Sequence, residues 1–171
     1  MTMDRLTWIE LDGWQAKLRF SACHFIPDHP KCGCLHGHTY AMSVRVIGEQ
    51  SGDFIMDFEE LKRYVAEICE PLDHRILLAS LDSDLQIKKI DKEHLSVVVG
   101  KHAKRYVFPE EDVVLLPIHS ASAEDLCSYL LDQLSGKLDA DHIREIYVRL
   151  DEGLGQGAGC ASYFRSTPRG I

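Results

Sequence analysis

The sequence predicts an α+β fold in which an antiparallel four-stranded sheet carries two helices on one face. Three observations favour this class. Apolar residues alternate with polar ones in four segments, two other segments have apolar residues every three to four positions, and the strand-like pairs lie at the two ends of the chain with the helical segments between them. With 171 residues and 45% hydrophobic content, the chain can bury one core, so we expect a single domain over residues 1–171.

The first two strands are expected over residues 16–26 and 38–48. In the first, alternation gives an inward face made of Leu18, Phe20, Ala22, His24 and Ile26. In the second, the residues that share a face are His38, Tyr40, Met42, Val44 and Val46. A turn and a short strand are expected next, at 52–58. Each of the two long strands therefore brings a histidine to a mainly apolar face.

Two segments have the periodicity of helices. Residues 58–72, FEELKRYVAEICEPL, are expected to end at Pro71. The second helix is expected within residues 120–138, where Ser122 is a suitable N-cap and Gly136 a suitable end. Its apolar stripe consists of Leu126, Leu130, Leu131 and Leu134. The cysteines on these helical patterns are predicted to be small core residues, namely Cys69 and Cys127.

The segment between the helices becomes polar from residue 81 to residue 116. Within it, the runs LSVVVG (95–100) and KRYVFP (104–109) are rich in β-branched and aromatic residues, so we expect an inserted β-hairpin. After the second helix, residues 143–153 and 159–165 predict the last two strands, which flank a glycine-rich turn.

Composition and charge exclude several classes of protein. The net charge is −8, and Lys and Arg occur together only in pairs, so we expect no nucleic-acid interface, although a local positive pocket is compatible with an anionic small substrate. No run of about 18 apolar residues occurs and the first ten positions mix in charges, so we expect a cytoplasmic protein without a membrane span. In that compartment the six cysteines would be thiols, metal ligands or catalytic groups.

Three histidines are placed to form a metal site. In the stretch KCGCLHGHTY, His36 and His38 share a face of an extended segment, and Gly37 between them lets another backbone come close. His24 lies on the inward face of the preceding strand, so two neighbouring strands offer three imidazoles. Three histidines with an open fourth position are the ligand set of a catalytic zinc ion.

Two other interpretations of these residues stay open. His24 alone would be a hydrogen-bonded core histidine. A closed structural zinc site would instead use Cys32, Cys34, His36 and His38. A straight strand spreads those four residues over about 20 Å, whereas zinc ligands lie only about 2.0–2.3 Å from the metal. This site would therefore need tight loops before His36.

Several residues near these histidines have the chemistry of proton transfer or of ligand binding. Cys32 is expected at the edge of the metal pocket, where the metal or Lys31 would lower the pKa of its thiol. The adjacent Asp73 and His74 form an acid–base pair, although such pairs are commonly surface or capping residues. Strand alternation carries Glu152 to the inward face at the end of a strand, where a carboxylate needs a partner such as a ligand amidine.

The ordered pattern F-S-A-C-H…C-x3-H-G-H…D-F…L-D-H…A-E…E resembles the family of 6-pyruvoyltetrahydropterin and 6-carboxytetrahydropterin synthases, over residues 14–163. The resemblance implies the tunnelling fold (T-fold) and a zinc ion held by His24, His36 and His38. It also implies that Cys32 is the proton-abstracting base, assisted by Asp73 and His74. Glu152 would hold the 2-amino-4-oxo edge of the pterin, and Ser122 and Glu124 would be further substrate-binding residues. Family members assemble as trimers stacked into hexamers, with active sites at subunit interfaces.

The three residues between Cys32 and His36 resemble the 6-carboxytetrahydropterin synthase branch of the queuosine pathway. That branch converts 7,8-dihydroneopterin triphosphate to 6-carboxy-5,6,7,8-tetrahydropterin, acetaldehyde and triphosphate. The alternatives are a 6-pyruvoyltetrahydropterin synthase, another dihydroneopterin side-chain lyase or aldolase, and a zinc-stabilised binding protein without catalysis. The chain departs from the usual pattern at five places, which are Cys23, Cys34, Ser122, the long 81–116 insertion and the glycine-rich turn after Glu152. Lys31 and Arg75 are either triphosphate ligands or ordinary solvated charges.

Overall fold

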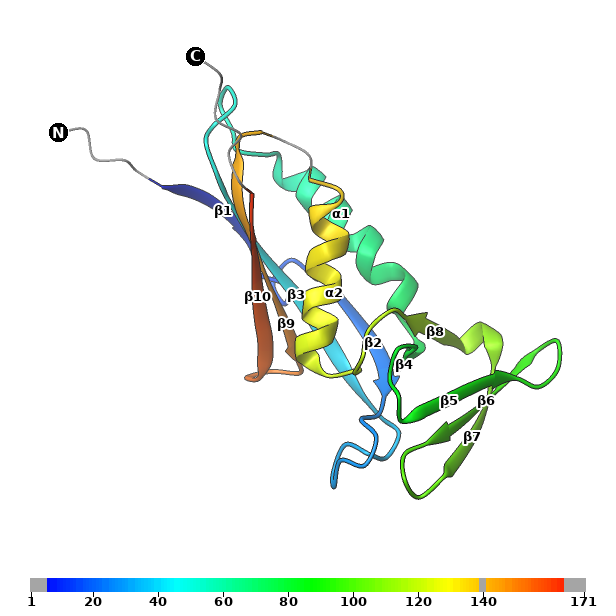
Figure 1. Cartoon of the computed structure of the whole chain (residues 1–171). Helices are drawn as coiled ribbons and strands as arrows, with labels where there is room; N and C mark the ends of the chain where they lie inside the picture. Colours follow the sequence, from blue (N-terminus) through cyan, green and yellow to red (C-terminus); the bar gives the residue numbers. More distant parts are fainter. Residues whose placement is uncertain (1–5, 139–140, 165–171) are drawn as a thin grey trace, which may run out of the picture.

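The structure, a computed structural model, describes residues 6–138 and 141–164. A seven-stranded sheet forms its centre (Figure 1). The strand order is β10–β9–β3–β2–β4–β8, and β1 pairs with the distal half of β3. The strands are β1 (Thr7–Leu11), β2 (Arg19–His24), β3 (His36–Gly48), β4 (Arg75–Ala79), β8 (Val113–Leu116), β9 (Ile143–Glu152) and β10 (Gly157–Tyr163). The fold is therefore α+β, as the sequence predicts.

The predicted four-stranded antiparallel sheet is only part of this sheet, so the prediction of its size was wrong. The strands β2, β3, β9 and β10 pair antiparallel as expected. However, β4 pairs parallel with β2, and β8 pairs parallel with β4, so the sheet is mixed. The run RILLA of β4 has no alternation, because a strand covered on both faces is apolar almost throughout. Periodicity therefore did not identify it.

The expected short strand at 52–58 is also absent. This segment forms a turn with one isolated bridge between Ser51 and Phe54. Asp57 instead begins the first helix, because its side chain accepts a hydrogen bond from Glu59 N at 2.6 Å. The last predicted strand, 159–165, corresponds to β10, and its final residue Arg165 lies outside the described residues.

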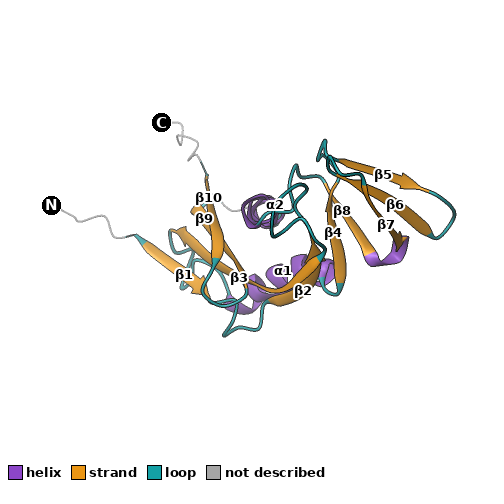
Figure 2. Ribbon diagram, turned by 90° about the horizontal axis from the view of Figure 1, so that it is seen from below, coloured by secondary structure: helices purple, strands orange, loops and turns teal. Residues whose placement is uncertain are grey.

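Both helices lie on one face of the curved main sheet, as Figure 2 shows. Helix α1 (Phe58–Cys69) continues into a short 3₁₀ turn, η1 (Glu70–Leu72), and α2 (Ala123–Ser135) packs on β9 and β10. The predicted caps of α2 are confirmed, since Ser122 accepts a hydrogen bond from Asp125 N and Gly136 is the C-cap. The predicted core cysteines, Cys69 and Cys127, are both buried. No described helix is long and apolar enough to cross a bilayer.

The hairpin predicted from residues 95–100 and 104–109 is confirmed within the 81–116 segment, and a third antiparallel strand extends it to a three-stranded sheet. Its strands are β5 (Leu85–Lys89), β6 (His94–Val99) and β7 (Lys104–Pro109), followed by a 3₁₀ turn, η2 (Glu110–Asp112). The sequence analysis missed β5 because only two apolar residues stand among its charged and polar ones. This insert sheet has its own small core, which consists of Phe25, Leu78, Val97, Val99 and Phe108. Phe25 directly follows the strand that ends at His24, so the insert sheet packs beside the end of the main sheet that carries His24.

Candidate metal centre and active site

The three candidate metal ligands lie together at one end of the main sheet. His24 is the last residue of β2 and pairs in register with His36, the first residue of β3, while His38 stands opposite Ala22. The ring centroids are 4.5 Å apart for His24–His36, 5.2 Å for His24–His38 and 5.0 Å for His36–His38. Their potential ligand nitrogens all lie within 4.8 Å of one another. A Cβ at Gly37 would lie 3.1 Å from the carbonyl oxygen of Ala22, so this close strand pair favours glycine there.

Hydrogen bonds fix which ring nitrogen His24 and His36 present to the cluster. Nδ1 of His24 lies 2.6 Å from the carbonyl oxygen of Ala121 and Nδ1 of His36 lies 2.7 Å from that of Cys34. A carbonyl only accepts, so each Nδ1 carries the proton and each Nε2 has a free lone pair. Burial lowers the pKa of His24, which keeps its imidazole neutral. Its Nε2 is fully buried and makes no hydrogen bond.

This donor set fits a zinc ion. Neutral imidazoles are good zinc ligands, and second hydrogen bonds from Nδ1 to carbonyl oxygens are the usual way of orienting them. A buried nitrogen without a partner is unfavourable unless something binds it. His24, His36 and His38 would therefore hold the metal, and their number leaves a coordination position open.

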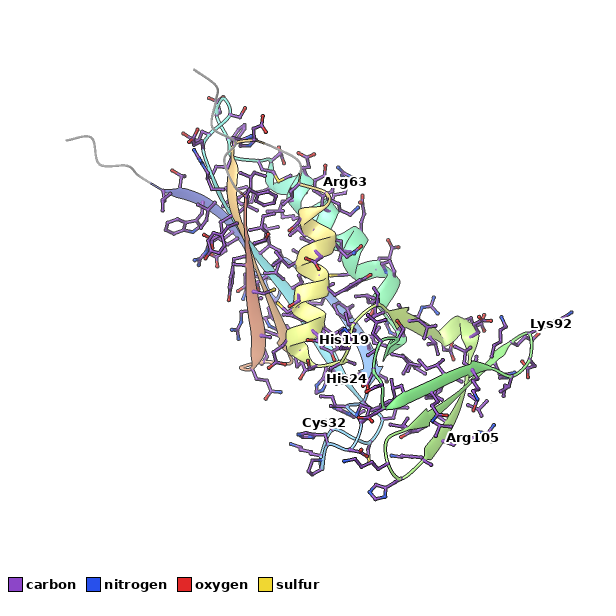
Figure 3. The ribbon with its side chains drawn as sticks, in the orientation of Figure 1. His24, Cys32, Arg63, Lys92, Arg105 and His119 are labelled. Atoms are coloured by element: carbon purple, nitrogen blue, oxygen red, sulfur yellow. The ribbon has the colours of Figure 1, made fainter. Side chains whose placement is uncertain are left out.

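The closed Cys2His2 interpretation is not supported by the geometry. Within residues 6–138 and 141–164, the metal-competent cluster consists of the three histidines without Cys32 or Cys34. Cys34 is exposed, and its sulfur lies 3.5 Å from Nζ of Lys104 in the insert sheet. Cys32 is half-buried in the loop between His24 and His36, at the end of the sheet that carries the histidine cluster (Figure 3).

Glu152 ends β9 beside the histidine cluster. One carboxylate oxygen lies 3.7 Å from Nε2 of His24 and accepts a hydrogen bond from the hydroxyl of Tyr40 at 3.3 Å. Burial, reinforced by the Glu152 carboxylate, raises the pKa of Tyr40, so this phenol stays a neutral donor. The neighbouring Asp151 faces the other side, where Trp14 Nε1 donates to it at 3.1 Å and Arg149 pairs with it at 2.7 Å. Glu152 rather than Asp151 thus faces the metal site.

Asp73 and His74 form a second, separate group. Asp73 accepts a hydrogen bond from Ser21 N at 2.7 Å and lies 2.9 Å from Nδ1 of His74. The hydrogen bond from the Ser21 N–H lowers the pKa of the Asp73 carboxyl most, and the contact with His74 lowers it further. The side chain of His74 is 83% exposed. The backbone at this residue has a φ of 58°. His74 borders a groove of about 570 Å³ that His38 also borders.

The other two predicted substrate-binding residues occupy the start of α2. Ser122 caps the helix, and the preceding Ala121 carbonyl reaches His24, so this end of α2 adjoins the metal site. Glu124 is exposed in the first turn.

Sequence reasoning did not identify Ala121 or Tyr40 as parts of the site. Ala121 acts through a main-chain carbonyl, which leaves no signature in residue type. Tyr40 could have been predicted, because it lies two residues after His38 and so on the same face of the strand.

The fold is α+β, and the site is a three-histidine cluster compatible with metal binding. A sequence profile of the 6-pyruvoyl tetrahydropterin synthase family matches residues 15–162, and the chain belongs to this family of pterin lyases.

Three relatives illustrate the range of activities named in this family. A Methanocaldococcus jannaschii protein, provisionally named 6-carboxy-5,6,7,8-tetrahydropterin synthase, is 39% identical over 160 residues, which cover 91% of this chain and 96% of the relative. The solved structure of Plasmodium falciparum 6-pyruvoyl tetrahydropterin synthase superposes with a TM-score of 0.86 at 28% identity, covering 94% of this chain and 100% of that one. The Pyrococcus furiosus dihydroneopterin monophosphate aldolase is 43% identical over 49 residues, covering 29% of this chain and 43% of the enzyme.

Proposed function

We propose that this chain is a zinc-dependent 6-carboxytetrahydropterin synthase, which converts 7,8-dihydroneopterin triphosphate and one water molecule to 6-carboxy-5,6,7,8-tetrahydropterin, acetaldehyde and triphosphate. Such a step serves the biosynthesis of queuosine-type 7-deazapurines. The observation that carries the proposal is the contact of 3.7 Å between His24 Nε2 and the Glu152 carboxylate, which supports a metal ion held beside an anchor for a pterin ring. The spacing of Cys32 from His36 and the Methanocaldococcus jannaschii relative favour the carboxy branch.

Each protein group has a distinct part in the proposed reaction. Zinc, when bound, acts as a Lewis acid toward the side-chain hydroxyls of the substrate. Glu152 holds the amino and ring N–H groups of the pterin, so that the side chain meets the histidine cluster. Cys32 removes a proton from the substrate side chain, and His74, oriented by Asp73, exchanges protons during tautomerisation and elimination. Ser122 and Glu124 line the same end of the site from α2.

We also propose a trimer-based assembly, a hexamer, in which active sites form at subunit interfaces. The support is the position of the Asp73–His74 pair. His74 is the most exposed of the proposed catalytic groups, and the groove that it borders with His38 is open to solvent in the single chain. A second copy could close such a groove.

Product analysis with zinc-loaded protein tests the proposed reaction. We expect dihydroneopterin triphosphate to be consumed with release of acetaldehyde and 6-carboxytetrahydropterin, measured by trapping the aldehyde and by chromatography of the pterins. Formation of 6-pyruvoyltetrahydropterin without acetaldehyde would instead assign the chain to the 6-pyruvoyl tetrahydropterin synthases, a candidate that the likeness to the Plasmodium falciparum structure favours. Cleavage of the monophosphate in preference to the triphosphate would favour an aldolase.

Stoichiometric zinc with no consumption of any dihydroneopterin phosphate would contradict a catalytic role. The chain would then be a zinc-stabilised binding protein.

Replacing Glu152 with glutamine should raise KM for the pterin substrate by about 10–100-fold, because each hydrogen bond to a charged acceptor contributes about 1.5–3 kcal/mol. The glutamine amide cannot accept both N–H groups of the pterin edge, so the substrate should bind more weakly. We expect kcat and zinc content to change little. Steady-state kinetics and metal analysis measure both. Glu145→Gln, the same exchange near the other end of β9, is the control. Loss of zinc from Glu152→Gln would make Glu152 a metal ligand rather than the pterin anchor.

A further inference from the structure

The loop between β2 and β3 sets the position of Cys32. This loop runs from Phe25 to Leu35 and joins two candidate metal ligands. It closes on itself through main-chain bonds, since Ile26 N donates to the carbonyl of Cys32 at 2.8 Å and Gly33 N donates to that of His29 at 3.0 Å. A Cβ at Gly33 would lie only 2.6 Å from that His29 carbonyl oxygen, so the tight turn requires glycine. The backbone around Cys32 is therefore held in one compact arrangement.

His29 makes a direct link to Cys32. Its Nδ1 accepts the N–H of Cys32 at 2.9 Å and the N–H of Lys31 at 3.3 Å. His29 therefore accepts hydrogen bonds from the N–H groups two and three residues later, as Asn and Asp side chains do in Asx turns. The N–H and the carbonyl of Cys32 are thus both hydrogen-bonded within the loop, and the partner of the N–H is the His29 side chain.

The insert sheet anchors this loop from outside. The carboxylate of Asp28, the residue before His29, accepts the N–H of Lys101 at 3.2 and 3.3 Å. Phe25, at the start of the loop, stacks on Tyr106 with ring centroids 5.5 Å apart and an angle of 11°. Leu35, at its end, packs against the core of the insert sheet. Figure 3 shows Cys32 beside this sheet, on which Arg105 is labelled.

We infer that His29 is a positioning residue for Cys32, and that the insert sheet holds His29 in place through Asp28. The inference rests on the proposed function, because the position of Cys32 affects catalysis only if its thiol moves a proton. A displacement of about 1 Å at a reacting group can lower the rate by about 100-fold, so a loop that fixes the thiol has a measurable effect.

His29→Ala and His29→Asn, made in the full zinc-loaded chain, form the test. The amide oxygen of asparagine stands where Nδ1 stands in histidine and accepts the same two N–H groups, whereas alanine accepts neither. His94→Ala is the matched control, because His94 is another partly exposed histidine, at the start of β6, bonded through Nδ1 to Asp91 at the far end of the insert sheet. Residue-resolved amide hydrogen exchange, zinc content, kcat and KM are measured for all variants.

In His29→Ala we expect the Cys32 amide to exchange about 10-fold faster and kcat to fall about 10-fold, with KM and zinc content unchanged. His29→Asn should restore both exchange protection and kcat, and His94→Ala should match the wild type at Cys32. Unchanged exchange in His29→Ala would overturn the inference, as would faster exchange with an unchanged kcat. Absence of turnover in the wild type would remove the proposed function, and the exchange comparison would still support or overturn the link between His29 and Cys32.

Discussion

Replacing Cys32 with alanine is expected to lower kcat for dihydroneopterin triphosphate by about 10²–10⁴-fold, the usual contribution of a positioned general base. Zinc content should stay at the wild-type level, because Cys32 lies outside the cluster of nitrogens that would bind the ion. The substrate should still bind, since Glu152 and the three histidines are unchanged. Single-turnover kinetics and metal analysis of the same preparation measure both quantities.

Cys34→Ser is the matched control for this prediction. Cys34 lies two residues away in the same loop and is more exposed, and serine keeps a polar partner for Lys104. Its kcat should stay close to that of the wild type, so a loss confined to Cys32→Ala would separate thiol chemistry from disturbance of the loop. If Cys32→Ala lost its zinc, Cys32 would be a ligand and the role of base would pass to another group.

The clustering of the three histidines could be predicted from sequence because strand alternation is a local property. The pattern around His24 and the His36–Gly37–His38 triplet fixed the faces of two strands, and the structure pairs His24 with His36 in register. Helix α2 could be predicted for a similar reason. Its N-cap at Ser122 and its stripe of leucines all act within a few residues of one another.

The parts that the sequence analysis missed depend on contacts between distant segments. The parallel strands β4 and β8 are short and apolar almost throughout, so they carry no alternation, and they pair with each other although the insert sheet separates them in the sequence. The Ala121 carbonyl that orients His24 comes from 97 residues further along the chain. Cys127 was predicted as a core residue, but its sulfur also lies 3.1 Å from that of Cys160 on β10. Residue type alone indicates none of these contacts.

Replacing His24 with alanine is expected to have the largest effect on metal binding. Removing a group that merely orients a ligand lowers metal affinity by about 10–100-fold, so loss of a ligand itself should exceed about 100-fold. His24 is also the most buried of the three histidines, and its Nε2 makes no hydrogen bond within the described residues. His24→Ala should therefore purify without stoichiometric zinc and should show no turnover.

The thermal response to zinc distinguishes loss of the ligand from general damage to the fold. A ligand present at 100 times its Kd stabilises the native state by about 2.7 kcal/mol, which raises the Tm of a chain of this size by about 5–10 °C. Wild-type protein treated with chelator should regain this rise when zinc is added, whereas His24→Ala should not. His142→Ala removes a hydrogen bond of 2.8 Å to the Ile55 carbonyl far from the metal site, so its Tm should fall while the zinc-dependent rise persists. A zinc-dependent rise retained in His24→Ala would remove His24 from the ligand set, and the cysteines of the β2–β3 loop would then have to supply the missing donor.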